Sequence, residues 1–252
     1  MSVFLIGSLH GAPGVSTTAL LLAGCFTSGL LVEADSDGGV LAVRHGLGRE
    51  PGLTTLAGAR TTVGWGPHAQ TIGGVAVLVG PESPERTMAL WAHAGDRIAA
   101  VLTAPDVNGQ TDVVVDVGRF RNGWPLPALA REASRWMVVV RPVAEELVVL
   151  SQRLPAWAAA GIPVGVVLAG SGPYTAADVA GEFGVEVLAT LPVDRRAAST
   201  LTDGGSRRVL ARSGLARAVR SLADTLTRSA EAPTEVTHAQ PSHAGPSAGV
   251  RP

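Results

Sequence analysis

Lysine is absent from this sequence: the 20 residues counted as Lys or Arg are all arginines, and with 21 acidic residues they give a net charge of −1. A nearly neutral chain has no overall field that would attract nucleic acid or an anionic membrane. The single cysteine excludes an intramolecular disulfide, and no cysteine or histidine spacing suits zinc. No uninterrupted apolar run reaches the about 18 residues of a membrane-spanning helix. These absences predict a cytoplasmic protein, in which Cys25 is a small apolar residue of a buried helix.

The residues that are abundant predict an α/β fold with a large core. Of the 252 residues, 46% are hydrophobic and 16% are charged. Short, mostly β-branched runs without polar alternation are typical of strands covered on both faces, and they lie at residues 3–6, 30–32, 75–79, 113–117, 136–140, 164–168 and 187–191. Stretches with helical spacing alternate with them, at residues 16–28, 85–103, 126–134, 144–160 and 176–183. We therefore expect a doubly wound, mostly parallel sheet with helices on both faces and a ligand crevice at the carboxyl edge of the strands.

The C-terminal part of the chain divides into a helix and a tail. Residues 207–228 place four apolar residues along one helical stripe, Leu215, Val219, Leu222 and Leu226. The arginines of this segment favour a solvated outer face, with nonspecific contact to DNA phosphates as the alternative; they include Arg207, Arg208, Arg212, Arg217 and Arg220. Residues 230–252 contain four prolines and no large apolar residue except two valines. The sequence therefore predicts one domain over residues 1–229 and a disordered tail over residues 230–252.

A glycine-rich turn follows the first predicted strand and precedes an apolar helix. Residues 10–17 read His-Gly-Ala-Pro-Gly-Val-Ser-Thr. Such a turn lets backbone N–H groups converge on a phosphate at the positive end of the helix dipole. The pattern GxxxxGK[ST] adds a lysine that reaches the phosphates and a hydroxyl that holds magnesium, but Val15 replaces the lysine and Leu9 the first glycine. On this segment alone, an ordinary glycine turn explains the residues equally well.

Acidic residues follow two other predicted strands. Glu33 and Asp35 follow the strand at residues 30–32, and Asp116 lies near the end of the strand at residues 113–117. A carboxylate at the end of a buried strand is costly unless it meets a metal, water or a hydrogen-bond donor. A crevice at this edge of the sheet could supply all three. The alternative for Asp116 is a helix-capping or turn aspartate.

With these landmarks in order, residues 2–228 resemble the ParA/MinD family of deviant P-loop ATPases, which position plasmids, chromosomes, division sites and pili. Gly11, Gly14, Ser16 and Thr17 match the family loop KGGxGK[ST][ST]. His10 and Val15 stand where the family has its two lysines. The resemblance implies a P-loop NTPase-like fold and a nucleotide-binding loop formed by Gly11, Ala12, Pro13, Gly14, Val15, Ser16 and Thr17.

The resemblance also implies roles outside the loop. Asp35 takes the place of the acid that positions the attacking water, which makes it the candidate catalytic residue. Ser16 would hold magnesium directly, and Asp116 would hold it through water. Pro192 and Asp194 match a turn near the adenine, although residues 168–171 lack the family's base-reading asparagine. ATP and Mg²⁺ are the implied cofactors, and a homodimer with a protein partner or cargo adaptor is the implied assembly.

The missing lysines set the expected activity. Phosphoryl transfer depends on positive charge placed at the γ-phosphate, and Val15 supplies none. We expect a nucleotide-binding positioning protein with weak or absent hydrolysis, of the kind that localises a pilus or secretion system (TadZ/CpaE-like). The alternative is a protein-interaction scaffold that binds no nucleotide. An arginine could replace the lysine, and Arg119 is the nearest in sequence, although the favoured interpretation of Arg119 is an exposed loop residue.

The composition of the tail generates the first prediction. Deleting residues 230–252 should leave the melting temperature unchanged within error, because nothing in this segment can pack on the domain. Thermal unfolding of the full-length and truncated chains provides the measurement. A drop of several degrees would show that the tail docks.

Overall fold

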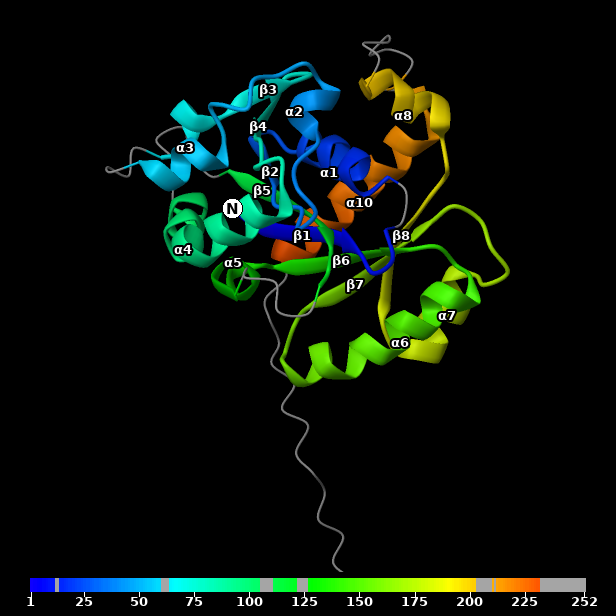
Figure 1. The fold of residues 1–252 in the computed structure, drawn as a ribbon. Coiled ribbons are helices and arrows are strands. Elements are labelled where there is room, and N and C mark those ends of the chain that lie inside the picture. Colours follow the sequence, from blue (N-terminus) through cyan, green and yellow to red (C-terminus); the bar gives the residue numbers. More distant parts are fainter. Residues whose placement is uncertain are drawn as a thin grey trace, which may run out of the picture.

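The computed structural model describes residues 1–11, 14–59, 64–104, 111–121, 127–202, 210 and 212–231 (Figure 1). The described chain forms one sheet with the strand order β3-β4-β2-β5-β1-β6-β7-β8. The strands are β1 (Val3–Ser8), β2 (Gly29–Glu33), β3 (Gln70–Ile72), β4 (Val75–Leu78), β5 (Asp112–Arg119), β6 (Arg135–Val140), β7 (Val164–Ala169) and β8 (Glu186–Leu191). All neighbouring strands pair in parallel except β3, which pairs antiparallel with β4. The predicted doubly wound α/β fold is therefore confirmed.

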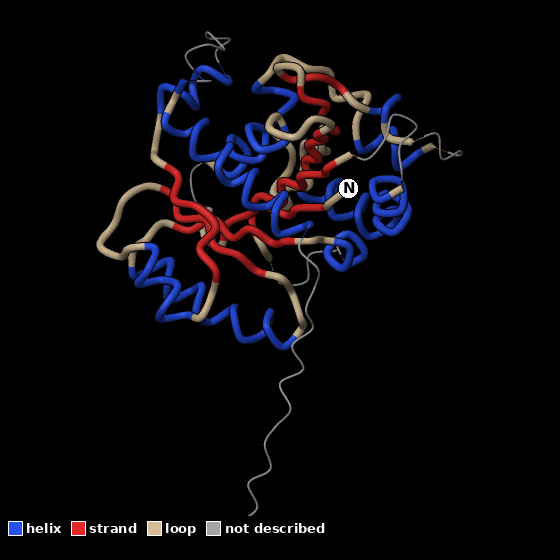
Figure 2. Tube along the Cα trace, turned by 180° about the vertical axis from the view of Figure 1, so that it is seen from behind, coloured by secondary structure: helices blue, strands red, loops and turns tan. Residues whose placement is uncertain are grey.

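Helices cover both faces of the sheet (Figures 1 and 2). They are α1 (Val15–Ala23), α2 (Leu41–Arg44), α3 (Leu53–Gly58), α4 (Pro84–Thr103), α5 (Pro127–Glu132), α6 (Ala144–Ala159), α7 (Ala176–Phe183), α8 (Arg195–Thr202) and α10 (Gly214–Glu231), with a short 3-10 turn at Gly66–His68. No helix in these described ranges is both long and apolar enough to cross a membrane.

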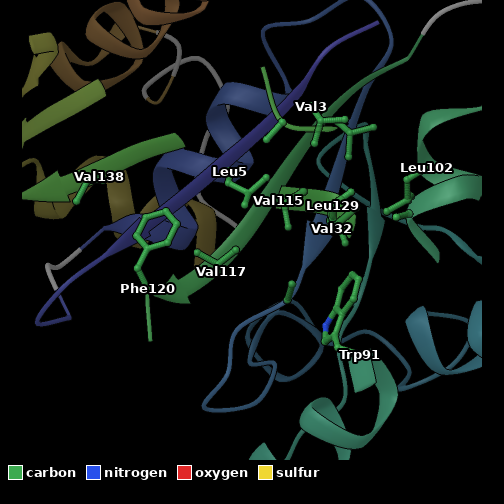
Figure 3. Close-up of a cluster of buried hydrophobic side chains, with 14 of the residues drawn as sticks. Val3, Leu5, Val32, Trp91, Leu102, Val115, Val117, Phe120, Leu129 and Val138 are labelled. Carbon is green, nitrogen blue, oxygen red and sulfur yellow. The ribbon is translucent and has the colours of Figure 1, made fainter. Parts of the chain in front are cut away.

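Two apolar cores form because strand side chains alternate between the faces. Val3 and Leu5 of β1 pack with residues of α3 to α7, including Trp91 (Figure 3). Phe4 and Ile6, from the same strand, pack on the other face with residues of α1, α2, α8 and α10. A strand that is buried on both sides needs apolar residues at every position, which explains the continuous runs in the sequence.

The C-terminal helix matches its predicted stripe, although it begins later than expected, at Gly214. Leu215, Val219, Leu222 and Leu226 are buried, whereas Arg212, Arg217 and Arg220 are exposed, as expected of a solvated outer face. The helix continues to Glu231, two residues past the predicted end of the domain at residue 229. Arg207, Arg208 and residues 232–252 lie outside the described residues.

Three local expectations need correction. The helix expected over residues 16–28 ends at Ala23, because β2 begins close by: a Cβ on Gly29 would lie 1.9 Å from the carbonyl oxygen of Ala23. Cys25 therefore lies in the turn after α1, where it is exposed rather than buried in a helix. Strand β3 was not expected, since its three residues are too few to show a period.

Candidate functional site

The glycine-rich turn carries the end of β1 to the start of α1. Gly14 occupies the N-cap position with a φ of 96°, a conformation open to glycine, and no side chain caps the helix. The first turn of α1 contains no acidic residue of its own, and the first N–H groups of a helix have no partner within the helix. The turn is tied to the sheet by Ser8, whose hydroxyl oxygen accepts from Gly11 N at 2.9 Å and donates to Gly118 O at 3.2 Å. This end of α1 has the backbone features of an anion site.

Asp116 of β5 is a buried carboxylate beside this turn, with 1% of its surface exposed. Its Oδ1 accepts a hydrogen bond from Gly118 N at 2.9 Å, whereas Oδ2 has no partner among the described residues. Burial raises the pKa of this carboxyl to about 7; the Ser16 hydroxyl and the Gly118 N–H oppose the rise, and Asp35 and Glu33 add to it. Ser16 therefore lies close to Asp116, although it forms no hydrogen bond to Oδ2.

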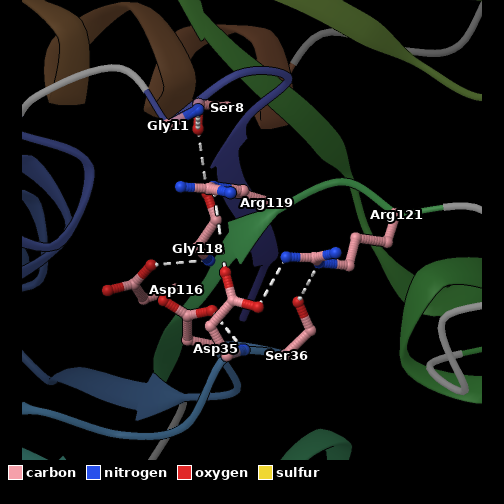
Figure 4. A network of polar contacts seen from close by, with 9 residues as sticks. Ser8, Gly11, Asp35, Ser36, Asp116, Gly118, Arg119 and Arg121 are labelled. Atoms are coloured by element: carbon pink, nitrogen blue, oxygen red, sulfur yellow. Dashed lines mark hydrogen bonds and ion pairs between the residues drawn. The ribbon is translucent and has the colours of Figure 1, made fainter. Parts of the chain in front are cut away.

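A bulge at the end of β5 brings the acids together. Ile6 of β1 pairs with Asp116 and the next residue, Gly7, pairs with Gly118, so the register between the strands shifts by one residue. Gly118 has a φ of 60°, and a Cβ there would lie 2.1 Å from the carboxyl carbon of Asp35. Only glycine at this position lets the Asp35 side chain approach β5 (Figure 4).

The two acids that follow each other at the end of β2 have different surroundings. Glu33 accepts from the backbone N–H groups of Val40 (2.6 Å), Leu41 (2.8 Å) and Gly80 (2.9 Å), and thus anchors the start of α2. Asp35 accepts only a local bond from Asp37 N, at 2.8 Å. Burial raises the pKa of both carboxyls. Glu33 therefore has a structural role, and Asp35 is the acid that faces the site.

Most of the predicted residues line one cleft of about 240 Å³. The lining includes Gly11, Gly14, Val15, Ser16, Thr17 and Asp35 from the prediction, together with Ser8, Asp37, Arg44, Gly118 and Arg119. Asp116 is buried and does not itself line the cleft, although its Oδ1 accepts from Gly118 N, which belongs to a lining residue.

A larger hollow of about 1020 Å³ lies at the other end of α1, but it contains none of the residues predicted to bind nucleotide or magnesium. The smaller cleft is therefore the candidate site, because most of the predicted residues and several charged side chains meet there.

Positive charge reaches this cleft from arginines. Arg119 is exposed, as the favoured interpretation expected, but it is the last residue of β5 rather than a loop residue. Its Nε lies 3.8 Å from Oδ2 of Asp37, and its guanidinium lies against Gly11 (Figure 4). Arg121 binds the same carboxylate at 2.5 Å and donates to the Ser36 hydroxyl at 3.0 Å.

Other predicted residues lie away from the cleft or outside the description. Asp194 accepts from Ala197 N at 2.9 Å and so caps α8, and neither it nor Pro192 lines the cleft. His10 is exposed and is not part of the lining. Ala12 and Pro13 lie outside the described residues.

Sequence reasoning missed Ser8, Asp37, Gly118 and Arg44 as residues of the cleft. The sequence could have indicated two of them: Ser8 ends the strand that precedes the turn, and Asp37 follows the acidic end of β2 by a few residues. Arg44 had no such signal, since it reaches the cleft only through the placement of α2.

The donor set fits a phosphate-bound magnesium ion better than an all-protein metal site. The described residues contain no group of three His, Cys, Asp or Glu side chains that could hold a metal alone. Magnesium commonly keeps several waters and is bound by one or two protein groups plus phosphate oxygens. The unpartnered Oδ2 of Asp116 and the nearby Ser16 hydroxyl meet that description. The residues present therefore fit a magnesium nucleotide, apart from the absent lysine.

Comparison with known proteins gives matches at the level of structure. No protein-family model matches the sequence, and no curated protein matches it. The septum site-determining protein MinD of Pyrococcus horikoshii, complexed with Mg-ADP, has a TM-score of 0.70 at 16% identity, over 91% of this chain and 97% of that one. The ParA family ATPase of Chlorobium tepidum has a TM-score of 0.72 at 16% identity, over 88% and 97%. MinD in the MinC:MinD complex of Aquifex aeolicus gives 0.67 at 13%, over 90% and 96%.

The raised pKa of Asp116 generates a prediction about stability. A carboxyl with a pKa of 3.8 when unfolded and about 7 when folded binds its proton more tightly in the folded state. The free energy of unfolding should therefore fall as the pH rises from about 4 to about 7, by up to about 4 kcal/mol in metal-free buffer. Asp116→Asn should remove this part of the pH dependence. Urea unfolding in EDTA at several pH values provides the measurement.

The control for this prediction is Asp112→Asn, at the other end of the same strand, where the side chain accepts from Ser2 N. This variant should keep the pH dependence of the unchanged chain. If Asp116→Asn also keeps it, the carboxyl of Asp116 is ionised throughout that range and the account of its burial is wrong.

Proposed function

Because the chain has the fold of the MinD and ParA ATPases, we propose that it binds Mg–ATP in the cleft between α1, β2 and β5 and hydrolyses it slowly or not at all. The observation that carries the proposal is Asp116. A buried carboxylate with an unpartnered oxygen is destabilising, and such groups in native folds call for a ligand, water or ion. It lies beside Ser16 at an uncapped helix start that suits phosphate.

Each residue of the cleft has a role under this proposal. The N–H groups at the start of α1 bind phosphate oxygens, and Ser16 and Asp116 hold magnesium, Asp116 through water. The magnesium ion supplies charge that neutralises the phosphate oxygens. Asp35 lines the same cleft and would orient a water. Val15 is buried, with 6% exposed, and brings no charge, so the residues of the loop do little to stabilise the transition state.

The biological role that we propose is positioning, in the cytoplasm, of a cellular assembly such as a pilus or secretion system. A homodimer would recruit a protein partner or cargo adaptor in its nucleotide-bound form. The support is the fold shared with a MinD that is found in a MinC:MinD complex. A scaffold that binds no nucleotide is the competing function, favoured by the valine at the place of the lysine.

Nucleotide titration tests the proposal directly. Mg–ATP should bind measurably to the full chain by calorimetry and more weakly in EDTA, and Asp116→Ala should lose much of the part of the affinity that depends on magnesium. Asp112→Ala, on the same strand but at the opposite edge, should bind like the unchanged chain. ATP hydrolysis should stay near background. Absence of binding under all conditions would favour the scaffold, and turnover of about 1 s⁻¹ or faster that Asp116→Ala abolishes would contradict the expected inactivity.

Val15→Lys tests whether the turn is a phosphate loop that has lost its charge. Val15 is the first residue of α1 and lines the cleft, so the ammonium of a lysine at this position can extend from the helix start toward the phosphates. A charge-assisted contact of about 1.5–3 kcal/mol should raise nucleotide affinity about ten-fold or more.

Val15→Met is the matched control for this experiment, since it has a long stem without charge and should leave affinity unchanged. Asp116→Ala combined with Val15→Lys should reverse much of the magnesium-dependent gain. Should Val15→Lys fold normally without any gain in affinity, the turn does not place this position toward phosphates, and the scaffold becomes the better function.

A further inference from the structure

The cleft contains an arginine at the point where the loop would meet phosphate. A Cβ placed on Gly11 would lie 2.8 Å from an Nη atom and 3.0 Å from Nε of Arg119. The guanidinium therefore lies directly against the first glycine of the turn, and Figure 4 shows it between Gly11 and the acids below. A bulkier residue than glycine at position 11 would displace the guanidinium from this place.

Arg119 is held there loosely. Its Nε is 3.8 Å from Oδ2 of Asp37, which is longer than a hydrogen bond. The other oxygen of Asp37 already accepts from Arg121 at 2.5 Å, and Arg121 is fixed further by the Ser36 hydroxyl. The Arg119 and Asp37 side chains are 46% and 44% exposed, so water screens their attraction and little free energy is needed to separate them.

We propose that Arg119 is the phosphate-binding cation of this cleft, in place of a loop lysine, and that Asp37 holds it when no phosphate is bound. The inference rests on the proposed function and names the residue that gives it affinity. Phosphate attracts a guanidinium more strongly than a shared carboxylate does, because it offers several oxygens that the planar fork binds in pairs. Asp37 keeps Arg121 as its partner after Arg119 leaves, so no carboxylate is left without a cation.

Arg119 suits this role better than Arg44, the other arginine that lines the cleft. Arg44 ends the short helix α2, away from the strand that carries Asp116. Arg119 belongs to β5, three residues after Asp116, so one strand would carry both the cation for phosphate and the acid for magnesium. Side chains placed on a strand inside a sheet are positioned more precisely than those on short surface elements.

The experiment compares the binding of Mg–ATP, Mg–ADP and AMP to the full chain by calorimetry. Arg119→Ala should weaken Mg–ATP binding about ten-fold or more, with a smaller loss for AMP, because fewer phosphate oxygens are available. Arg119→Lys should recover part of the affinity, which a purely structural role for the side chain would not explain. Asp37→Asn should strengthen Mg–ATP binding a few-fold, since it releases Arg119.

Arg49→Ala is the matched control: Arg49 pairs with Glu82 on the surface, does not line the cleft, and should bind Mg–ATP like the unchanged chain. Equal binding by Arg119→Ala and the unchanged chain would overturn the inference and leave the proposed function standing. Weaker binding by Asp37→Asn would overturn the role given to Asp37. If no nucleotide binds to the unchanged chain or to any variant, the proposed function itself fails. Arg119→Gln, of similar length and polarity, replaces Arg119→Ala if the latter does not fold.

Discussion

The geometry of the cleft depends on the burial of one carboxylate, that of Asp116. Its Oδ1 can reach the N–H of Gly118 because the register between β1 and β5 shifts at this point. Gly118 lacks the Cβ that would clash with Asp35, so the Asp35 side chain can lie against β5. The carbonyl oxygen of Gly118 accepts a hydrogen bond from the Ser8 hydroxyl, whose oxygen accepts one from the N–H of Gly11 in the turn. The loop, the bulge and both acids are thus held by a chain of contacts that begins at a single buried group.

The charges around this group are balanced so that an anion is not repelled. Burial raises the pKa of Asp116 to about 7, so this carboxyl carries only part of its negative charge near neutral pH, and burial also raises the pKa of Asp35. Asp37, the exposed acid of the cleft, is engaged by two arginines. A divalent cation bound near Asp116 would displace its proton, so metal binding and proton release are linked at this position. The cleft is therefore suited to take up a cation and a phosphate together rather than either alone.

Much of the fold could be predicted from the sequence because a strand that is buried on both faces is apolar along nearly its whole length. Strands β5 and β7 have such apolar runs without polar alternation, so the sequence indicates them directly. Strand β3 was not predicted, because three residues are too few to show a period. Helix α1 was predicted to be longer than it is, because the close approach of Gly29 to Ala23 that ends it is a tertiary contact. At the site, the glycines and Asp116 followed from a motif, but the position of Arg119 did not. Which way its side chain turns depends on the bulge and on Asp37, and neither can be read from the local sequence.

Under our proposal, this cleft differs from one with a loop lysine in the element that carries the phosphate-binding cation. A lysine at position 15 would extend from α1, the same element whose N–H groups bind phosphate, so its loss leaves that helix without a charged contact. Arg119 extends instead from β5, and its partner Asp37 follows β2, the strand that pairs with β5 and ends next to Asp35. Under our proposal, phosphate binding would therefore free Asp37 from Arg119 and alter the contacts at the end of β2. This links occupancy of the cleft to the segment that leads into α2, in which Asp37 and Val40 are exposed and could be contacted by a partner without any hydrolysis.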